Sequence, residues 1–246
     1  MEVNNPHTTI DWTQVALPEG ERNLPVYLLL DTSHSMAGEP IEALKQGLTL
    51  LQKELAADAE TAQIVKLGTV VFNSTAELSD DRLTTITEFQ APELAACGCT
   101  RLDLAFDKLA ESITRDVASP VKFGRKGDWK PVVFVLTDGC PTNEEGHADS
   151  ERWIAAKERV LHSAKGIMKP AMIVAVGCGA KVSDETLKEI GTGPAFRIGT
   201  EMNSFAAFFQ FVSASIRATV QRSMSLGQQP AQMAEPPVSV CIQKVI

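Results

Sequence analysis

The sequence lacks the features of a membrane or secreted protein. None of its apolar stretches approaches the ~18 residues needed to span a bilayer, and its first seven residues contain neither the basic region nor the apolar core of a signal peptide. Its five cysteines are scattered without the spacing of a disulfide scaffold, so reduced thiols are the default. We therefore expect a soluble, cytoplasmic protein that does not contact a membrane.

Positive charge is also scarce. The net charge of the 246-residue chain is −8, and no block of Lys or Arg appears in it. Because nucleic-acid binding requires a basic face that neutralises phosphates, this composition argues against a nucleic-acid partner. The apolar fraction of 44% is enough to build the core of one α/β domain.

Two common catalytic signatures are missing as well. The sequence contains neither the glycine-rich phosphate loop with its lysine nor the Gly-x-Ser-x-Gly nucleophile elbow. The four histidines have no spacing that identifies a general base. We therefore expect a protein that is not an enzyme.

An apolar run that ends in hard oxygen donors is the most informative feature that is present. The run over 24–30 is rich in β-formers and too apolar to have a wet face, so it predicts a strand that is buried on both sides of a parallel sheet. Asp31, Ser33 and Ser35 follow it at every second position. In such sheets ligands collect beyond the carboxyl ends of the strands, and carboxylate and hydroxyl oxygens suit Mg²⁺ better than a soft metal.

Two further donors occur in matching places. A second buried run over 132–137 ends in Asp138, and Gly139 allows a sharp turn there. Thr100 precedes a helical pattern, near a predicted N-cap, and can offer its hydroxyl to the same edge of the sheet. Each residue alone also fits a helix cap or a turn, but three loops that supply oxygen donors together predict a metal site.

Strand and helix patterns alternate along the chain. This order predicts an α/β fold, with a doubly wound, mostly parallel central sheet and helices on both faces. The further strands are expected at 64–72, 171–177 and 195–198, with a short edge strand before residue 94. The expected helices carry apolar residues at helical spacing: Ile41 to Leu55, Leu102 to Ile113, Trp153 to Ile167 (with Ala156, Val160 and Ala164), Ser183 to Ile190 and Phe205 to Ile216.

These residues resemble the von Willebrand factor A family over roughly 24–224, a Rossmann-like fold. Its metal-ion-dependent adhesion site is written Asp-x-Ser-x-Ser, then Thr, then Asp, which Asp31, Ser33, Ser35, Thr100 and Asp138 match position by position. The resemblance implies that the hydroxyls touch Mg²⁺ (or Mn²⁺), that the acids act largely through water, and that an exposed Asp or Glu of a protein partner completes the coordination.

Three stretches are similar to a narrower group, the bacterial tellurium-resistance TerY type. They are the runs 24–31, 36–43 and 126–131. This similarity implies an adaptor in a stress-response system that also contains a protein kinase and a PP2C-like phosphatase, which are candidate partners. The chain departs from the family at His34, Cys97, Cys99 and Cys140.

Two alternatives for the same loops stay open. Asp31 could act as the nucleophile of an Mg²⁺-dependent phosphoryl-transfer enzyme or hydrolase. The thiols of Cys97, Cys99 and Cys140, together with His34, could instead form a zinc or redox site around the hard donors.

The two ends of the chain lie outside the region 24–224 that resembles the von Willebrand factor A family. Residues 1–23 are polar and predict an N-terminal arm, with Trp12 and Leu17 as anchors. Residues 225–246 contain a Pro-rich linker followed by alternating apolar residues at Val238, Val240 and Ile242. This alternation is consistent with a strand on a sheet edge, and a disordered tail is the alternative.

Overall fold

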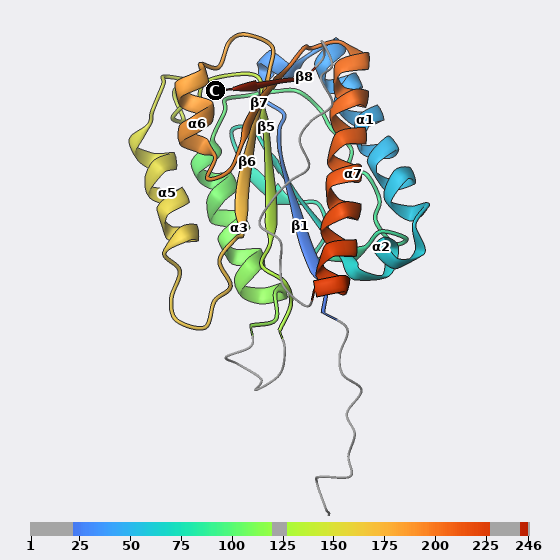
Figure 1. Cartoon of the computed structure of the whole chain (residues 1–246). Helices are drawn as coiled ribbons and strands as arrows, with labels where there is room; N and C mark the ends of the chain where they lie inside the picture. Colours follow the sequence, from blue (N-terminus) through green and yellow to red (C-terminus); the bar gives the residue numbers. More distant parts are fainter. Residues whose placement is uncertain (1–21, 120–126, 227–241, 246) are drawn as a thin grey trace, which may run out of the picture.

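The apolar runs of the sequence form a central sheet between two layers of helices (Figure 1). The computed structural model describes residues 22–119, 127–226 and 242–245. The eight strands lie in the order β3-β2-β1-β5-β6-β7-β8, and β4 also pairs with β2. Their bounds are β1 Leu24–Asp31, β2 Val65–Phe72, β3 Ala76–Leu78, β4 Thr84–Thr85, β5 Val132–Thr137, β6 Met172–Cys178, β7 Ala195–Ile198 and β8 Ile242–Val245.

Parallel pairing confines the carboxyl ends of the central strands to one edge. Strands β2, β1, β5, β6 and β7 are mutually parallel, whereas β3, β4 and β8 are antiparallel to their neighbours. All eight residues of β1 are buried, as expected for a strand covered on both faces. The predicted α/β fold with a mostly parallel sheet is confirmed.

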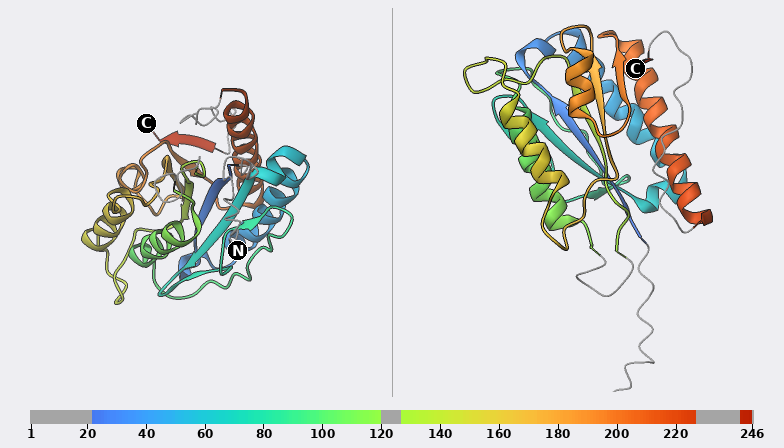
Figure 2. Two further views of the ribbon diagram at one scale, coloured as in Figure 1. Left: turned by 90° about the horizontal axis from the view of Figure 1, so that it is seen from below. Right: turned by 60° about the vertical axis from the view of Figure 1, so that its left-hand side comes forward.

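Helices cover both faces of the sheet, as the two further views show (Figure 2). One core contains Val26, Leu28 and Leu30 of β1 with residues of α1 and α7, and the other contains Tyr27 and Leu29 with residues of α3 and α5. Successive side chains of β1 point to opposite faces of the sheet and therefore pack into two different cores. The helices are α1 Glu39–Ala56, α2 Ala59–Ile64, α3 Leu102–Asp116, α5 Glu151–Leu161, α6 Asp184–Ile190 and α7 Met202–Leu226, with a 3₁₀ turn at His34–Met36.

Some element boundaries differ from the prediction. Helix α5 ends at Leu161, so Ala164 and Ile167 lie beyond it, and Ile167 packs against the core from the following turn. The helical spacing continued because a core-facing turn buries the same residue types. The short helix α2, capped by the Asp58 side chain, was not predicted.

Of the predicted C-terminal stretch, residues 225 and 226 end helix α7 and residues 242–245 form a strand. Strand β8 pairs antiparallel with β7 at the sheet edge, and its Ile242 is buried. Val238 and Val240 lie outside the described residues, as do Trp12 and Leu17 of the expected N-terminal arm.

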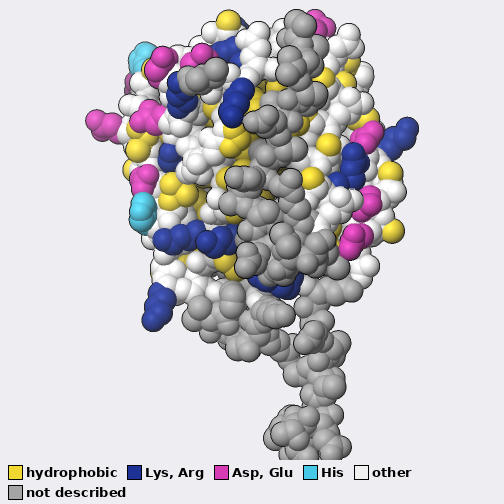
Figure 3. All heavy atoms as spheres, viewed as in Figure 1, with side chains coloured by type: hydrophobic (Ala, Val, Ile, Leu, Met, Phe, Trp, Pro, Cys, Tyr) yellow, Lys and Arg dark blue, Asp and Glu magenta, His cyan; other side chains and the backbone are white. Residues whose placement is uncertain are grey.

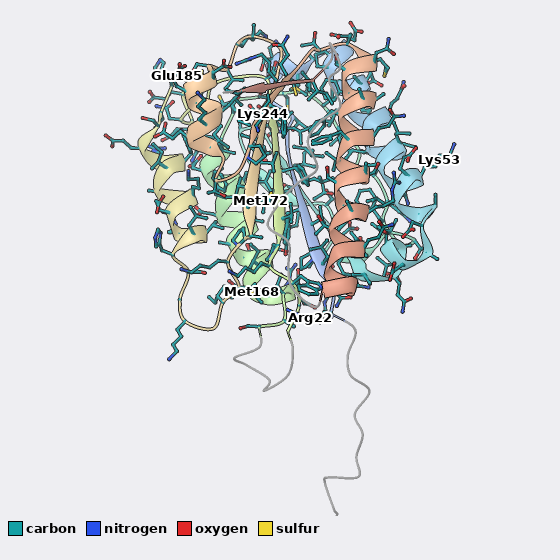
Figure 4. All side chains as sticks on the ribbon, viewed as in Figure 1. Arg22, Lys53, Met168, Met172, Glu185 and Lys244 are labelled. Atoms are coloured by element: carbon teal, nitrogen blue, oxygen red, sulfur yellow. The ribbon has the colours of Figure 1, made fainter. Side chains whose placement is uncertain are left out.

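The motif at 127–131 joins two segments at the amino end of the sheet. Asp128 is buried and accepts hydrogen bonds from the Asn23 backbone, the Asn23 amide side chain and the Ala118 backbone. Arg22 stacks on Trp129 with its guanidinium carbon 3.7 Å from the ring centroid, at the base of the molecule (Figure 4). These contacts fix the start of β1 against the segment that leads into β5.

The surface carries charges of both signs. On the face shown in Figure 3, acidic and basic side chains lie interspersed among polar and apolar ones. Among the described residues no helix is long and apolar enough to cross a bilayer.

Helices α1 and α7 approach each other closely at Gly47. A Cβ atom added at Gly47 would lie 2.2 Å from Cδ2 of Phe209, whose ring is fully buried. Because a real Cβ cannot approach that closely, the absence of a side chain at this position sets the spacing of the two helices.

Gly47→Ala should therefore lower the free energy of unfolding by about 1–3 kcal/mol, although alanine favours an isolated helix by about 1 kcal/mol. Denaturant unfolding measures the change. Gln46→Ala, on the exposed face of the same helix, is the matched control and should leave stability unchanged or slightly raised. Equal stability of the two variants would show that the close approach is not a constraint.

Candidate metal centre

Asp31 is the most deeply buried acid of the predicted site. It is the last residue of β1 and is fully buried. Its Oδ1 accepts a hydrogen bond of 2.8 Å from the Ser33 backbone, and its Oδ2 accepts one of 2.6 Å from the Thr137 hydroxyl. These two donors fix the carboxylate at the carboxyl edge of the sheet.

A chain of hydroxyls connects the first loop to the second acid. The hydroxyl oxygens of Ser33 and Ser35 are 3.1 Å apart, and Ser35 donates a hydrogen bond of 2.5 Å to Oδ1 of Asp138. Asp138 immediately follows β5, the parallel neighbour of β1, and is also buried. The two strand ends thus bring Ser33, Ser35 and Asp138 into one cluster.

Thr100 reaches the same place from the third loop. A Cβ atom added at Gly139 would lie 3.7 Å from the Ser35 hydroxyl and 3.8 Å from the Thr100 hydroxyl, so both hydroxyls face this glycine. Thr100 is buried, and the N-cap of α3 is Arg101, one residue later. Thr100 therefore does not serve simply as the cap of its helix.

Backbone hydrogen bonds connect the three loops. Thr100 and Thr142 exchange two hydrogen bonds, which join the Thr100 loop to the segment after β5. His34 donates to the Gly98 carbonyl and Cys97 donates to the Thr32 carbonyl, which join the Thr100 loop to the segment after β1. All five predicted donors are therefore held at one edge of the sheet by a connected backbone.

The burial of Asp31 has an electrostatic cost. Desolvation raises the pKa of Asp31 to about 6, although hydrogen bonds from Thr137 and Ser33 lower it, and the neighbouring charge of Asp138 adds a smaller increase. The same surroundings raise the pKa of the buried Cys178 thiol well above its ordinary value. A positive charge nearby would favour the ionised form of the buried Asp31 carboxylate.

The donor set fits a small divalent cation. All five side chains offer oxygen, two of them as carboxylates, which is the set that Mg²⁺ and Mn²⁺ prefer. Glycine at position 139 leaves space between the Ser35 and Thr100 hydroxyls that a side chain would fill. The bound cation would be held by these hydroxyls, with Asp31 and Asp138 as the negative charges beside it.

Comparison with known protein families agrees with this geometry. The family model for the von Willebrand factor type A domain matches residues 26–214. The chain belongs to this family. No curated protein matches the A domain by sequence.

Solved structures share the fold of this A domain. The pilus adhesin SpaC from Lactobacillus rhamnosus GG has a TM-score of 0.60 at 12% identity, covering 79% of this chain and 30% of its own. A von Willebrand factor type A protein from Catenulispora acidiphila has a TM-score of 0.55 at 15% identity, covering 79% and 43%. Proximal thread matrix protein 1 from the mussel byssus, with a zinc-occupied adhesion motif, has a TM-score of 0.51 at 14% identity, covering 80% and 48%. The A domain thus spans less than half the length of each of these chains.

The geometry does not favour the two alternatives. Asp31 is fully buried and both of its carboxylate oxygens accept internal hydrogen bonds, which leaves it poorly placed to attack a substrate. The thiols point to separate partners: Cys97 to the Asn73 amide, Cys99 to the Glu144 carbonyl and Cys140 to the Lys181 carbonyl. Within the described residues no three His, Cys, Asp or Glu side chains are grouped to hold a metal ion.

Two residues of the site were missed by sequence reasoning. Thr137 donates to Asp31, and Lys181 places its ammonium 3.7 Å from Oδ2 of Asp138. The role of Thr137 could not be predicted from the sequence, because a β-branched residue is expected in a strand whether or not it contacts a site. Lys181 could have been found, since it follows β6, whose carboxyl end lies beside that of β5.

The raised pKa of Asp31 predicts a pH effect on the metal-free A domain. A carboxyl group whose folded pKa is raised stabilises the protein below its unfolded pKa, and this contribution is lost as the pH rises through the folded value. The difference between about 4 and about 6 corresponds to about 3 kcal/mol. In EDTA, the stability of the wild type relative to Asp31→Asn should fall by about this amount between pH 4 and pH 7.

Thermal or denaturant unfolding at several pH values measures this difference. Excess Mg²⁺ should reverse the trend for the wild type, because the cation requires the ionised carboxylate. A constant difference between the two proteins across this pH range in EDTA would contradict the assignment of a destabilised carboxylate at position 31.

Proposed function

We propose that the chain is a protein-binding module that uses a divalent cation, Mg²⁺ or Mn²⁺, to grip an acidic residue of a protein partner. The observation that carries this proposal is the convergence of oxygen donors from three loops. Ser33, Ser35 and Asp138 are hydrogen-bonded to one another, Thr100 lies across Gly139, and Asp31 is buried beside them.

The chemistry of these donors favours an outside carboxylate. When bound, the cation supplies a Lewis-acid centre for one oxygen of the partner. Three of the five donors are neutral hydroxyls, and Asp31 is held by internal hydrogen bonds, so the chain itself neutralises a dipositive ion only weakly. An exposed Asp or Glu of the partner supplies both the missing ligand and the missing charge.

The fold neighbours support a binding role. The SpaC structure is described as a pilus adhesin, and the mussel protein as a matrix protein whose adhesion motif holds zinc. Proteins of this kind act by holding other molecules, which favours a binding module over an enzyme for this chain.

We further propose that the module serves a bacterial stress-response system of the tellurium-resistance type. This part rests on the three sequence stretches that resemble the TerY group. The candidate partners are a protein kinase or a PP2C-like phosphatase of the same system, and the expected compartment is the cytoplasm.

The metal donors give the first test of this function. Asp31→Ala and Asp138→Ala should abolish Mn²⁺ binding, since each removes a charge. Ser33→Ala, Ser35→Ala and Thr100→Ala should each weaken it by roughly tenfold, because water can partly replace a neutral ligand. Isothermal titration calorimetry measures the affinities.

Asp107→Ala is the matched control for the two acids. Asp107 is an exposed acid of α3 that pairs with Arg159, and its loss should leave Mn²⁺ affinity unchanged. Unchanged binding in Asp31→Ala and Asp138→Ala would remove the basis of the site.

The partner gives the second test. Affinity purification with wild-type and Asp31→Ala protein, each in Mg²⁺ and in EDTA, should yield a protein that is present only with the wild type in Mg²⁺. Changing one particular Asp or Glu of that partner to Ala should abolish the complex. By linkage, the partner should raise the affinity for Mg²⁺ by the same factor that Mg²⁺ raises the affinity for the partner.

Calcium should support this complex less well, because it prefers more ligands at longer distances than this small cluster offers. A complex that forms equally well in EDTA would show that the partner is held by another part of the chain.

A further inference from the structure

Lys181 places a positive charge at the mouth of the metal centre. It lies in the loop between β6 and α6, and its ammonium is 3.7 Å from Oδ2 of Asp138, the oxygen that does not accept from Ser35. The Lys181 side chain is 68% exposed, whereas that of Asp138 is 3% exposed. The lysine therefore reaches from solvent onto a buried carboxylate.

The loop that carries Lys181 is held on several sides. The Arg197 guanidinium, from β7, donates to the carbonyls of Gly179 and Val182, and so fixes the backbone on either side of Lys181. The Cys140 thiol donates to the carbonyl of Lys181 itself, at 3.7 Å. The position of the Lys181 backbone beside the acid is thus built into the fold.

Lys181 is the basic side chain that pairs with an acid of the metal centre. Arg101 lies next to Thr100 along the chain, but its guanidinium is paired with Asp103 and Glu144. Across the ranges 22–119, 127–226 and 242–245, Lys181 is the one basic side chain paired with either acid of the metal centre.

We propose that Lys181 is an internal counter-ion. It pairs with the Asp138 carboxylate in the metal-free protein and competes with the divalent cation for that carboxylate. This inference rests on the proposed metal centre. The Lys181 ammonium lies beside the buried Asp138 carboxylate when no cation is present, and it must leave Oδ2 before a cation can be neutralised there. Because its side chain is flexible and mostly exposed, it can leave without any change in the backbone.

This role of Lys181 sets the cation concentration at which the metal centre is filled. A positive charge a few ångströms from a dipositive ion opposes its binding, even when water screens the pair. The lysine thus lowers the affinity, so that loading requires a higher cation concentration or the added carboxylate of a partner. After a cation has displaced it, the Lys181 ammonium remains at the opening of the metal centre, where the carboxylate of the partner binds.

The test compares Lys181→Gln with Lys53→Gln. Lys53 is an exposed lysine in the last turn of α1, far along the helix from the metal centre, and its loss changes the net charge equally (Figure 4). Calorimetric titration with Mn²⁺ in 20 mM salt should show roughly three- to tenfold tighter binding for Lys181→Gln, and wild-type affinity for Lys53→Gln. The gain should shrink in ~1 M salt, where the Debye length is about 3 Å.

Two further measurements separate a counter-ion from a merely structural residue. Lys181→Arg keeps the charge and should bind Mn²⁺ as the wild type does. In EDTA, Lys181→Gln should melt at or slightly below the wild-type temperature, and the increase in melting temperature on adding Mn²⁺ should be larger for this variant.

The outcomes are distinguishable. Tight wild-type binding with equal affinities for Lys181→Gln and Lys53→Gln would overturn the counter-ion role and leave the metal centre intact. Weaker binding by Lys181→Gln would overturn it also, since that would make the lysine a support of the site. No Mn²⁺ binding by any of these proteins would overturn the proposed function, and the counter-ion role with it.

Discussion

The burial of two like-charged carboxylates at one edge of a parallel sheet is the constraint on which the site depends. Asp31 and Asp138 end neighbouring strands that are apolar on both faces, so the fold itself carries both acids into a dry region. Their mutual repulsion and desolvation are offset only in part by the Ser33, Ser35 and Thr137 donors. The cation affinity that we propose for the site follows from this partly unmet charge.

The buried acids at the two ends of the sheet differ in how fully they are hydrogen-bonded. At the amino end, Asp128 accepts three N–H hydrogen bonds, two of them from backbone, and fixes the segments around β1. At the carboxyl end, Asp31 accepts one backbone N–H and one hydroxyl, and its pKa is raised to about 6. The first acid is fully satisfied by the chain and stabilises the fold. The second is less well satisfied, and its raised pKa is the sign of this difference.

The fold tolerates wide change in sequence. The similar solved structures share only 12–15% identity with this chain, and what they retain is the sheet with its helices. Loops at the carboxyl edge are free to vary because no strand pairing depends on them. The Lys181 loop is held by Arg197 of β7 and by Cys140, which belongs to the donor loop that carries Asp138.

The sequence by itself determined the alternating fold and predicted the five oxygen donors that the structure brings to one edge of the sheet. Apolar runs that end in Asp31 and Asp138 could be assigned as neighbouring buried strands because parallel sheets impose both the composition of the strands and the place of their loops. It did not determine where α5 ends, because Ala164 and Ile167 keep a helical spacing beyond the helix, although Ala164 is exposed and Ile167 packs from a turn. Nor did it indicate that Thr137 reaches Asp31, since contacts across neighbouring strands leave no periodic signal in the chain, and Lys181 could be connected with Asp138 only once β6 was placed beside β5. Only the tertiary structure decides which side chains meet at a sheet edge, because register and loop direction depend on packing between elements that are distant in sequence.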